Sequence, residues 1–106
     1  MTVNNMAQEL GFTAVNIEDD RELTGVYCCD LLSVAMATAK TDGAWVTVMG
    51  NANVIAVASL TDVACIVLAE GFTFDDAAVA AAKGKVSLFR SENPVYETAL
   101  SIGQLL

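Results

Sequence analysis

The sequence predicts a three-layer α/β/α domain with a mostly parallel sheet, and three observations carry this prediction. Two short segments, 44–49 and 64–69, are almost continuously apolar, as expected for strands buried on both faces. Each precedes a segment whose composition suits a helix. A strand over 23–29 and a helix over 31–40 come before them, joined by short loops. Strand–helix units in series favour right-handed crossovers between parallel strands.

The composition bounds the class of protein. We expect residues 1–106 to form a single domain. Hydrophobic residues make up 55% of the chain, which is high for its size and predicts some exposed apolar surface for a partner. No apolar run approaches the roughly 18 residues of a membrane helix, and the first residues lack a basic signal region. The expected location is cytoplasmic. The net charge of −8 argues against nucleic-acid binding.

The first part of the chain is predicted to contain two helices and two strands. Thr2 caps the first helix, which ends at Gly11. A short strand over 12–17 follows, and the strand over 23–29 contains an interior glycine, which often marks a bulge or a close backbone approach. Asp30 is expected to cap the next helix. One apolar stripe of that helix is predicted to cover the sheet: Leu31, Leu32, Ala35, Met36 and Ala39.

The second part is predicted to repeat the pattern around the segment 43–60. There, the strand over 44–49 ends at a Gly50-Asn51 break, and Asn51 or Asn53 caps a helix that runs to about residue 60. The strand over 64–69 leads to a helix that begins with the capping-box segment Thr73-Phe74-Asp75-Asp76. A short strand over 86–89 and a helix over 95–106, capped by Asn93, close the chain.

The reactive side chains give no enzyme signature. The chain has no histidine, and Ser33 and Ser59 sit within apolar helical segments rather than in a nucleophile elbow. Glycine-rich phosphate loops are also missing. Cys28, Cys29 and Cys65 do not form a CxxC pair, and we expect them to be buried, reduced thiols. We therefore predict no catalytic residue, no metal and no cofactor.

The loop after the central strand is the candidate ligand site. Loops at the carboxyl ends of strands are where α/β proteins usually bind ligands. Gly50, Asn51 and Asn53 place backbone N–H groups and two carboxamides at a helix N-terminus, which favours an anion. Thr47 joins the site if its hydroxyl reaches the loop. The alternative is that these residues only cap the helix.

Several segments resemble the DRTGG domain family. The resemblance begins at Thr24-Gly25 and Asp30-Leu31-Leu32, and it is most extended over Gly43–Ile55 (GAWVTVMGNANVI). It then covers most of the remaining chain: Ala64–Leu68, Gly71, the strand at Val86, and Tyr96–Ala99. The family occurs in front of the kinase domain of some HPr kinase/phosphorylases, inside certain CBS-domain pyrophosphatases, in some phosphotransacetylases, and as small stand-alone proteins.

The resemblance implies a fold like the amino-terminal domain of HPr kinase, association into dimers, and a regulatory rather than catalytic role. One departure concerns the candidate loop. Many members have a charged Gly-Asp-Arg-x-Asp loop where this chain has Gly50-Asn51-Ala52-Asn53, so any role that needs charge is in doubt. In addition, residues 1–106 contain no kinase, pyrophosphatase, acyltransferase or CBS segment, so we do not expect those activities of them.

Two functions are therefore expected. The first is a non-catalytic regulatory or interaction module that works through homodimerisation and docking to a partner protein, such as a separately encoded enzyme or kinase. The alternative is a sensing domain that binds a small ligand, for example a nucleotide, at the Gly50–Asn53 loop.

Overall fold

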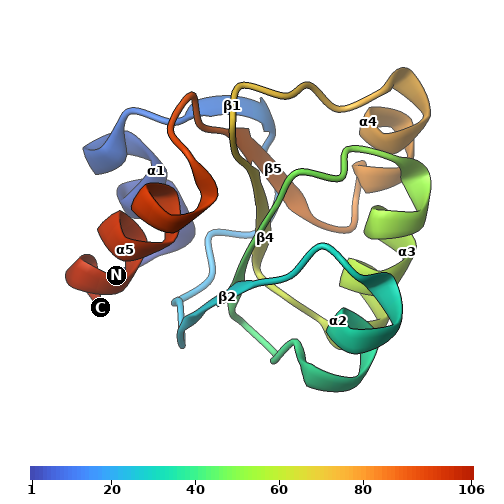
Figure 1. The fold of residues 1–106 in the computed structure, drawn as a ribbon, viewed down its shortest axis with the longest axis horizontal. Helices are drawn as coiled ribbons and strands as arrows, with labels where there is room; N and C mark the ends of the chain where they lie inside the picture. Colours follow the sequence, from blue (N-terminus) through green and yellow to red (C-terminus); the bar gives the residue numbers. More distant parts are fainter.

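Five strands form one sheet in the order β1-β5-β4-β3-β2, and five helices cover its two faces (Figure 1). The computed structural model describes all of residues 1–106. The strands are β1 (Thr13–Asn16), β2 (Val26–Cys28), β3 (Ala44–Thr47), β4 (Cys65–Leu68) and β5 (Ser87–Arg90). The helices are α1 (Val3–Leu10), α2 (Leu32–Thr38), α3 (Ala52–Thr61), α4 (Asp76–Ala82) and α5 (Val95–Leu105). None of these helices is long and apolar enough to cross a membrane.

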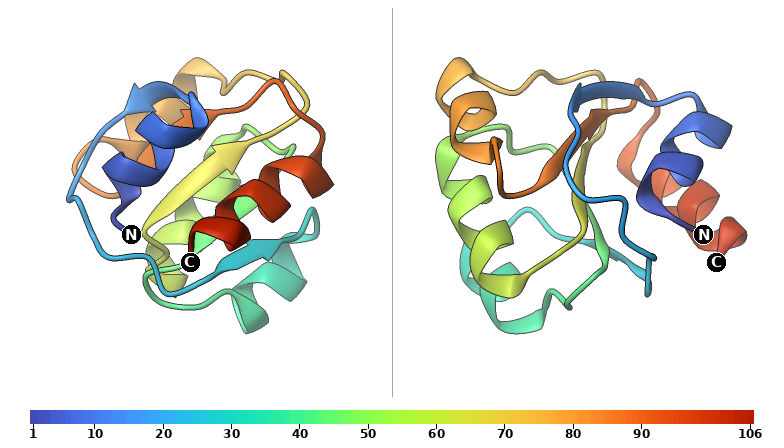
Figure 2. Two further views of the ribbon diagram at one scale, coloured as in Figure 1. Left: turned by 90° about the vertical axis from the view of Figure 1, so that its left-hand side faces the viewer. Right: turned by 180° about the vertical axis from the view of Figure 1, so that it is seen from behind.

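The predicted three-layer, mostly parallel architecture is confirmed. Strands β2, β3, β4 and β5 are parallel neighbours in chain order, and β1 pairs antiparallel with β5. The three connecting helices, α2, α3 and α4, lie together on one face of the sheet, whereas α1 and α5 lie on the other (Figures 1 and 2). Every crossover therefore passes over the same face.

The core follows the two-residue period of the strands. On one face, inward side chains pack against α2, α3 and α4, and they include Trp45, Ile66 and Leu88. On the other face, the alternating residues Val46, Val67 and Phe89 pack with α1 and α5. The central strands are thus buried on both faces, which explains their uninterrupted apolar sequences.

Two of the predicted helix starts are confirmed. Thr2 accepts a hydrogen bond from the Asn5 backbone N–H and caps α1, which ends at Gly11 with a φ of 70°. Asn51, one of the two alternatives for α3, accepts from the Val54 backbone N–H.

Three other predicted caps are wrong. The N-cap of α2 is Leu31, which offers no side-chain bond, because the Asp30 carboxylate is engaged by the loop after β3. Helix α4 is capped by Asp75 rather than Thr73, since the Asp75 backbone N–H is held by the Gly50 carbonyl and the chain turns later. Helix α5 has Pro94 as its N-cap, one residue after the predicted Asn93.

The predicted apolar stripe of α2 is confirmed only in part: Leu32 and Ala39 pack against the core beside Ala35, but Leu31 and Met36 do not. Only Ala35 of this helix is buried, while Leu31 is 59% and Met36 51% exposed. The physical reason is position: α2 has seven residues and lies beside the edge strand β2, so the sheet does not extend beneath its outer side (Figure 1). The periodicity is that of an amphipathic helix, and the core covers only the part of its apolar face that Leu32, Ala35 and Ala39 form.

The cysteines differ from one another. Cys65 lies in the core as predicted, and its burial raises the pKa of the thiol to about 12. Cys29 is half-buried, and Cys28 is exposed, which corrects the prediction that all three are buried. Cys28 is exposed because β2 is an edge strand. The pKa of Cys28 is nevertheless raised, by partial burial and by the nearby Asp30 carboxylate.

Candidate functional site

The loop after β3 is held by the Asp30 carboxylate, which the sequence did not associate with it. The buried Thr47 hydroxyl donates to Asp30 Oδ1 at 2.7 Å, and the Val48 backbone N–H donates to the same oxygen at 2.9 Å. Asp30 directly follows the neighbouring strand β2, so parallel pairing brings the two strand ends together. The Thr47 hydroxyl thus helps to hold the loop after β3 in place through its hydrogen bond to Asp30.

Gly50 is packed tightly against the loop that precedes α4. A Cβ atom at this position would lie 2.7 Å from the Thr73 carbonyl oxygen and 3.0 Å from the Phe74 Cα. The Gly50 carbonyl also accepts from the Asp75 backbone N–H at 2.9 Å. Of the four predicted site residues, Thr47 is buried and Gly50 half-buried, whereas Asn51 and Asn53 are exposed on the first turn of α3.

The order of the strands explains this close packing. In open α/β sheets, ligand crevices form where the strand order reverses and successive loops lean to opposite faces. Here β2 to β5 follow in chain order, and α2, α3 and α4 lie on one face, so the loops after β3 and β4 lean the same way and touch. The candidate loop therefore offers an outer surface of two asparagines rather than a cleft.

The most conspicuous apolar surface lies at the β2 edge. We call it the β2–α2 surface, and it consists of the outer edge of Val26–Cys28 with the exposed side chains of Leu31 and Val34, which lie on the same flank of α2 as Thr38. Strand β2 has a single neighbour, β3, to which Gly25 and Cys29 are hydrogen-bonded. Because strand residues alternate, the backbone groups of the intervening Val26 and Cys28 point away from the sheet.

The two edges of the sheet differ in their protection against pairing with a further strand: the β1 edge is protected, and the β2 edge is not. Strand β1 has an irregular register between Ala14 and Asn16, and the acidic segment Glu18-Asp19-Asp20 follows it. Bulges and charges are the usual means by which proteins prevent edge-to-edge pairing. The stretch from Thr24 to Cys29 carries no charge and pairs with β3 in regular register. The β2 edge is thus open to an additional strand.

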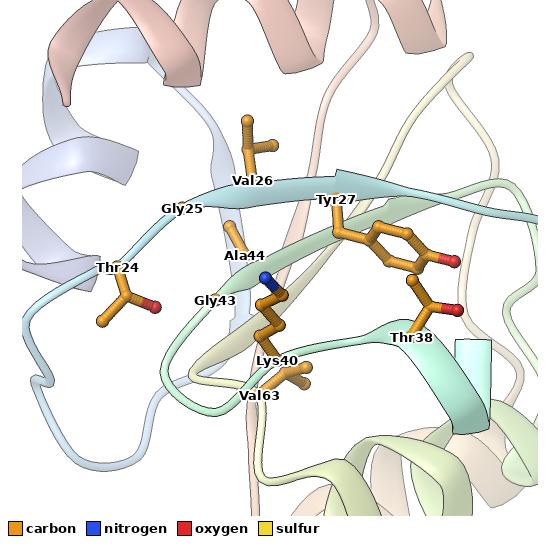
Figure 3. Close-up of a pocket in the computed structure, with 9 residues that line it drawn as sticks. All are labelled: Thr24, Gly25, Val26, Tyr27, Thr38, Lys40, Gly43, Ala44 and Val63. Carbon is orange, nitrogen blue, oxygen red and sulfur yellow. The ribbon is translucent and has the colours of Figure 1, made fainter.

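A pocket of about 290 Å³ lies at the amino-terminal end of β2 and β3, beside the C-terminal end of α2 (Figure 3). Its chemistry-bearing side chains are Tyr27, Thr38 and Lys40, none of which the sequence indicated as site residues. The one sequence signal was Gly25, the interior glycine of the strand. The pKa of Tyr27 is raised, chiefly by the hydrogen bond of its hydroxyl with the Cys29 side chain and also by partial desolvation.

Comparison with known proteins identifies the fold. No protein-family model matches the chain, and no curated protein matches its sequence. Among solved structures, it is similar to the crystal structure of the CBS and DRTGG domains of the regulatory region of Clostridium perfringens pyrophosphatase, complexed with its activator, diadenosine tetraphosphate. The TM-score is 0.78 at 15% sequence identity, over 99% of this chain. The chain has a DRTGG-like fold.

This finding confirms the resemblance at the level of fold. The DRTGG-like chain spans about half of the solved regulatory region, covering 47% of it. At 15% identity the shared architecture is what the match demonstrates, and the activator is a property of the pyrophosphatase region.

Proposed function

We propose that this DRTGG-like chain is a non-catalytic regulatory module that works by pairing with a second copy and docking to a partner protein. The observation that carries the proposal is the β2–α2 surface. It combines an unpaired strand edge with apolar side chains, of which Leu31 is 59% and Val34 43% exposed. The description of the similar solved structure as a regulatory region supports the regulatory role.

A second copy fits this surface for two reasons. Two β2 strands related by a twofold axis run antiparallel, so the outward backbone groups of Val26 and Cys28 can bond to the same groups of the other copy. The pairing also brings the two α2 helices towards each other and removes their apolar side chains from water. A standard interface covers about 800 Å² of each partner, which is about one-sixth of the 5177 Å² surface of this chain.

A separately encoded enzyme or kinase is the proposed partner of the assembled pair. The similar regulatory region belongs to a pyrophosphatase, and a module of the same fold would act on a catalytic chain in an analogous way. This part of the proposal rests on analogy of fold.

Lysine substitution on the β2–α2 surface tests the pairing. The natural chain is expected to be a dimer by light scattering and sedimentation at micromolar concentration. Cys28→Lys and Val34→Lys should each yield monomers, because like charges then face each other across the twofold axis. Ile17→Lys is the matched control, since Ile17 is an equally exposed apolar residue (56%) near the other edge.

The control variant should remain dimeric. A natural chain that stays monomeric over the whole concentration range would refute the proposal. It would also be refuted if Ile17→Lys dissociated the dimer as strongly as the two variants in the surface.

A second candidate function is nucleotide sensing at the Gly50–Asn53 loop. Its support is the activator-bound state of the similar regulatory region, together with the exposed carboxamides of Asn51 and Asn53 on the first turn of α3. Backbone N–H groups at that turn favour a phosphoryl group. The Thr47 hydroxyl is proposed to position the loop through Asp30 rather than to touch the ligand.

Thermal unfolding with diadenosine tetraphosphate tests this second candidate. Ligand at a hundredfold excess over its Kd stabilises the folded state by about 2.7 kcal/mol, so the melting temperature should rise by several degrees. Asn53→Ala should reduce that rise and leave the unliganded melting temperature unchanged, because Asn53 makes no capping bond. An unchanged melting temperature with ligand would exclude nucleotide sensing by this loop.

A further inference from the structure

We propose that the pocket at the amino-terminal end of β2 and β3 binds a small organic anion, with Lys40 as the cation and the Tyr27 ring as a wall. The ligand class is a molecule with one phosphoryl or carboxylate group and one planar ring. This site lies at the opposite end of the strands from the Gly50–Asn53 loop, and it adjoins the β2–α2 surface, with which it shares Val26.

The hollow exists because of Gly25. Gly25 directly precedes β2 and lies two residues before Tyr27. Because side chains alternate along a strand, a side chain at position 25 would point to the same face of the sheet as Tyr27, towards α2. A Cβ atom built on Gly25 meets nothing within 4 Å. The floor is apolar and is formed by Ala44 and Val63. The resulting volume of about 290 Å³ is near the lower limit of small-molecule sites, which suits a single ring with one substituent.

Lys40 is an uncommitted cation in a strongly acidic chain. The two arginines are both engaged by carboxylates, Arg21 with Asp42 and Asp62 and Arg90 with Glu92, but Lys40 forms no salt bridge. Figure 3 shows its side chain extending from the loop after α2 towards β2. An anion bound beside Lys40 would supply the missing counter-charge.

The acidic residues next to the pocket do not compete for Lys40. Asp42 and Asp62 adjoin the lining residues Gly43 and Val63, and a free carboxylate there would repel an anion. Arg21 is bonded to both, with its Nε 2.9 Å from Asp42 and its Nη1 3.0 Å from Asp62, so the three residues together carry one negative charge. Together with Lys40, these groups have no net charge, although the chain as a whole carries −8.

The remaining polar groups favour a ligand with a ring. The Tyr27 ring lines the pocket, and its hydroxyl group and that of Thr38 lie side by side beyond it (Figure 3). Aromatic rings pack against each other in offset or edge-to-face arrangements, which adds to the burial of apolar area. A phenol is neutral at physiological pH, so Tyr27 adds no negative charge that would repel an anion.

Titration of the ¹⁵N-labelled chain with phenyl phosphate tests the proposal, because this probe carries both expected groups. At millimolar concentrations it should shift the backbone amide signals of Gly25 and Gly43, whereas phenol and inorganic phosphate alone should bind more weakly. Shifts centred on Gly50, Asn51 and Asn53 would overturn the proposal and favour the other end of the strands. Failure of phenyl phosphate to shift any signal would also overturn it.

Two variants make the test specific. Gly25→Leu fills the hollow and should abolish binding while the melting temperature is retained, because a side chain there enters open space. Lys40→Gln should weaken binding about tenfold. Lys85→Gln removes an exposed lysine after α4 and is the matched control, which should bind as the natural chain does. Equal weakening by both lysine variants would show a general charge effect and no built site.

Discussion

Replacing Trp45 with alanine is expected to lower the free energy of unfolding by about 3–5 kcal/mol. Trp45 is completely buried among the residues that pack against α2, α3 and α4, so its removal leaves a large cavity. Its indole Nε1–H also donates to the Cys29 carbonyl at 3.0 Å, and this bond ties β3 to the end of the edge strand β2. The loss is a large fraction of the roughly 5–15 kcal/mol that stabilises a domain.

Urea unfolding followed by circular dichroism measures this loss. Fluorescence is unsuitable because Trp45 is the single tryptophan. Trp45→Phe is the matched control: it keeps an aromatic ring and removes the hydrogen bond, so it should cost less than the alanine variant. A decrease below about 1 kcal/mol for Trp45→Ala would contradict the burial described here.

Gly50→Ala is expected to destabilise the fold by about 1–3 kcal/mol, although it adds one methyl group. The added Cβ would lie 2.7 Å from the Thr73 carbonyl oxygen and 3.0 Å from the Phe74 Cα, and neither backbone atom can rotate away. The loops after β3 and β4 must then separate, which strains the bond from the Asp75 N–H to the Gly50 carbonyl. The same unfolding experiment measures the change.

Gly25→Ala is the control for this variant. Both glycines lie outside helices and strands with φ values that other residues adopt, but a Cβ on Gly25 meets nothing within 4 Å. Its stability should match that of the natural chain. If Gly50→Ala were equally harmless, the contact between the two loops would be looser than the structure shows, and the Gly50–Asn53 loop would have room for a ligand.

The layers and the mostly parallel sheet were predictable because they depend on patterns within the chain. The uninterrupted apolar segments of β3 and β4 can be buried only between two layers of helices. Short connections then force parallel neighbours and right-handed crossovers. Local capping at Thr2 and Asn51 was equally predictable, since each side chain bonds to a backbone N–H three residues away.

The predictions that failed concern features that depend on contacts between segments distant in the sequence. Asp30 was expected to cap α2, but it accepts from Thr47 and Val48, seventeen and eighteen residues later. The apolar stripe of α2 predicts burial, but its position beside the sheet edge leaves Leu31 and Met36 exposed. Periodicity reports which face of a helix is apolar, and it does not report what covers that face.

The candidate site likewise has some features that local sequence predicts and others that depend on contacts between distant segments. Position after a central strand placed Gly50, Asn51 and Asn53 correctly around the start of α3, and Thr47 is the last residue of β3. The tight contact of Gly50 with Thr73 could not be predicted, because it follows from all three crossovers lying on one face. The pocket at Lys40 and Tyr27 was missed because a turn lysine and a strand tyrosine have no spacing that marks them as partners.

The pairing of β1 with β5 has a consequence for how the chain folds during its synthesis. Thr13 pairs with Arg90, so β1 must wait for the last strand, whereas β2, β3 and β4 can assemble in the order in which they are made. Likewise, α1 and α5 together cover one face of the sheet. Until α5 emerges from the ribosome, that half of the core stays open to water, and the nascent chain holds a one-sided sheet.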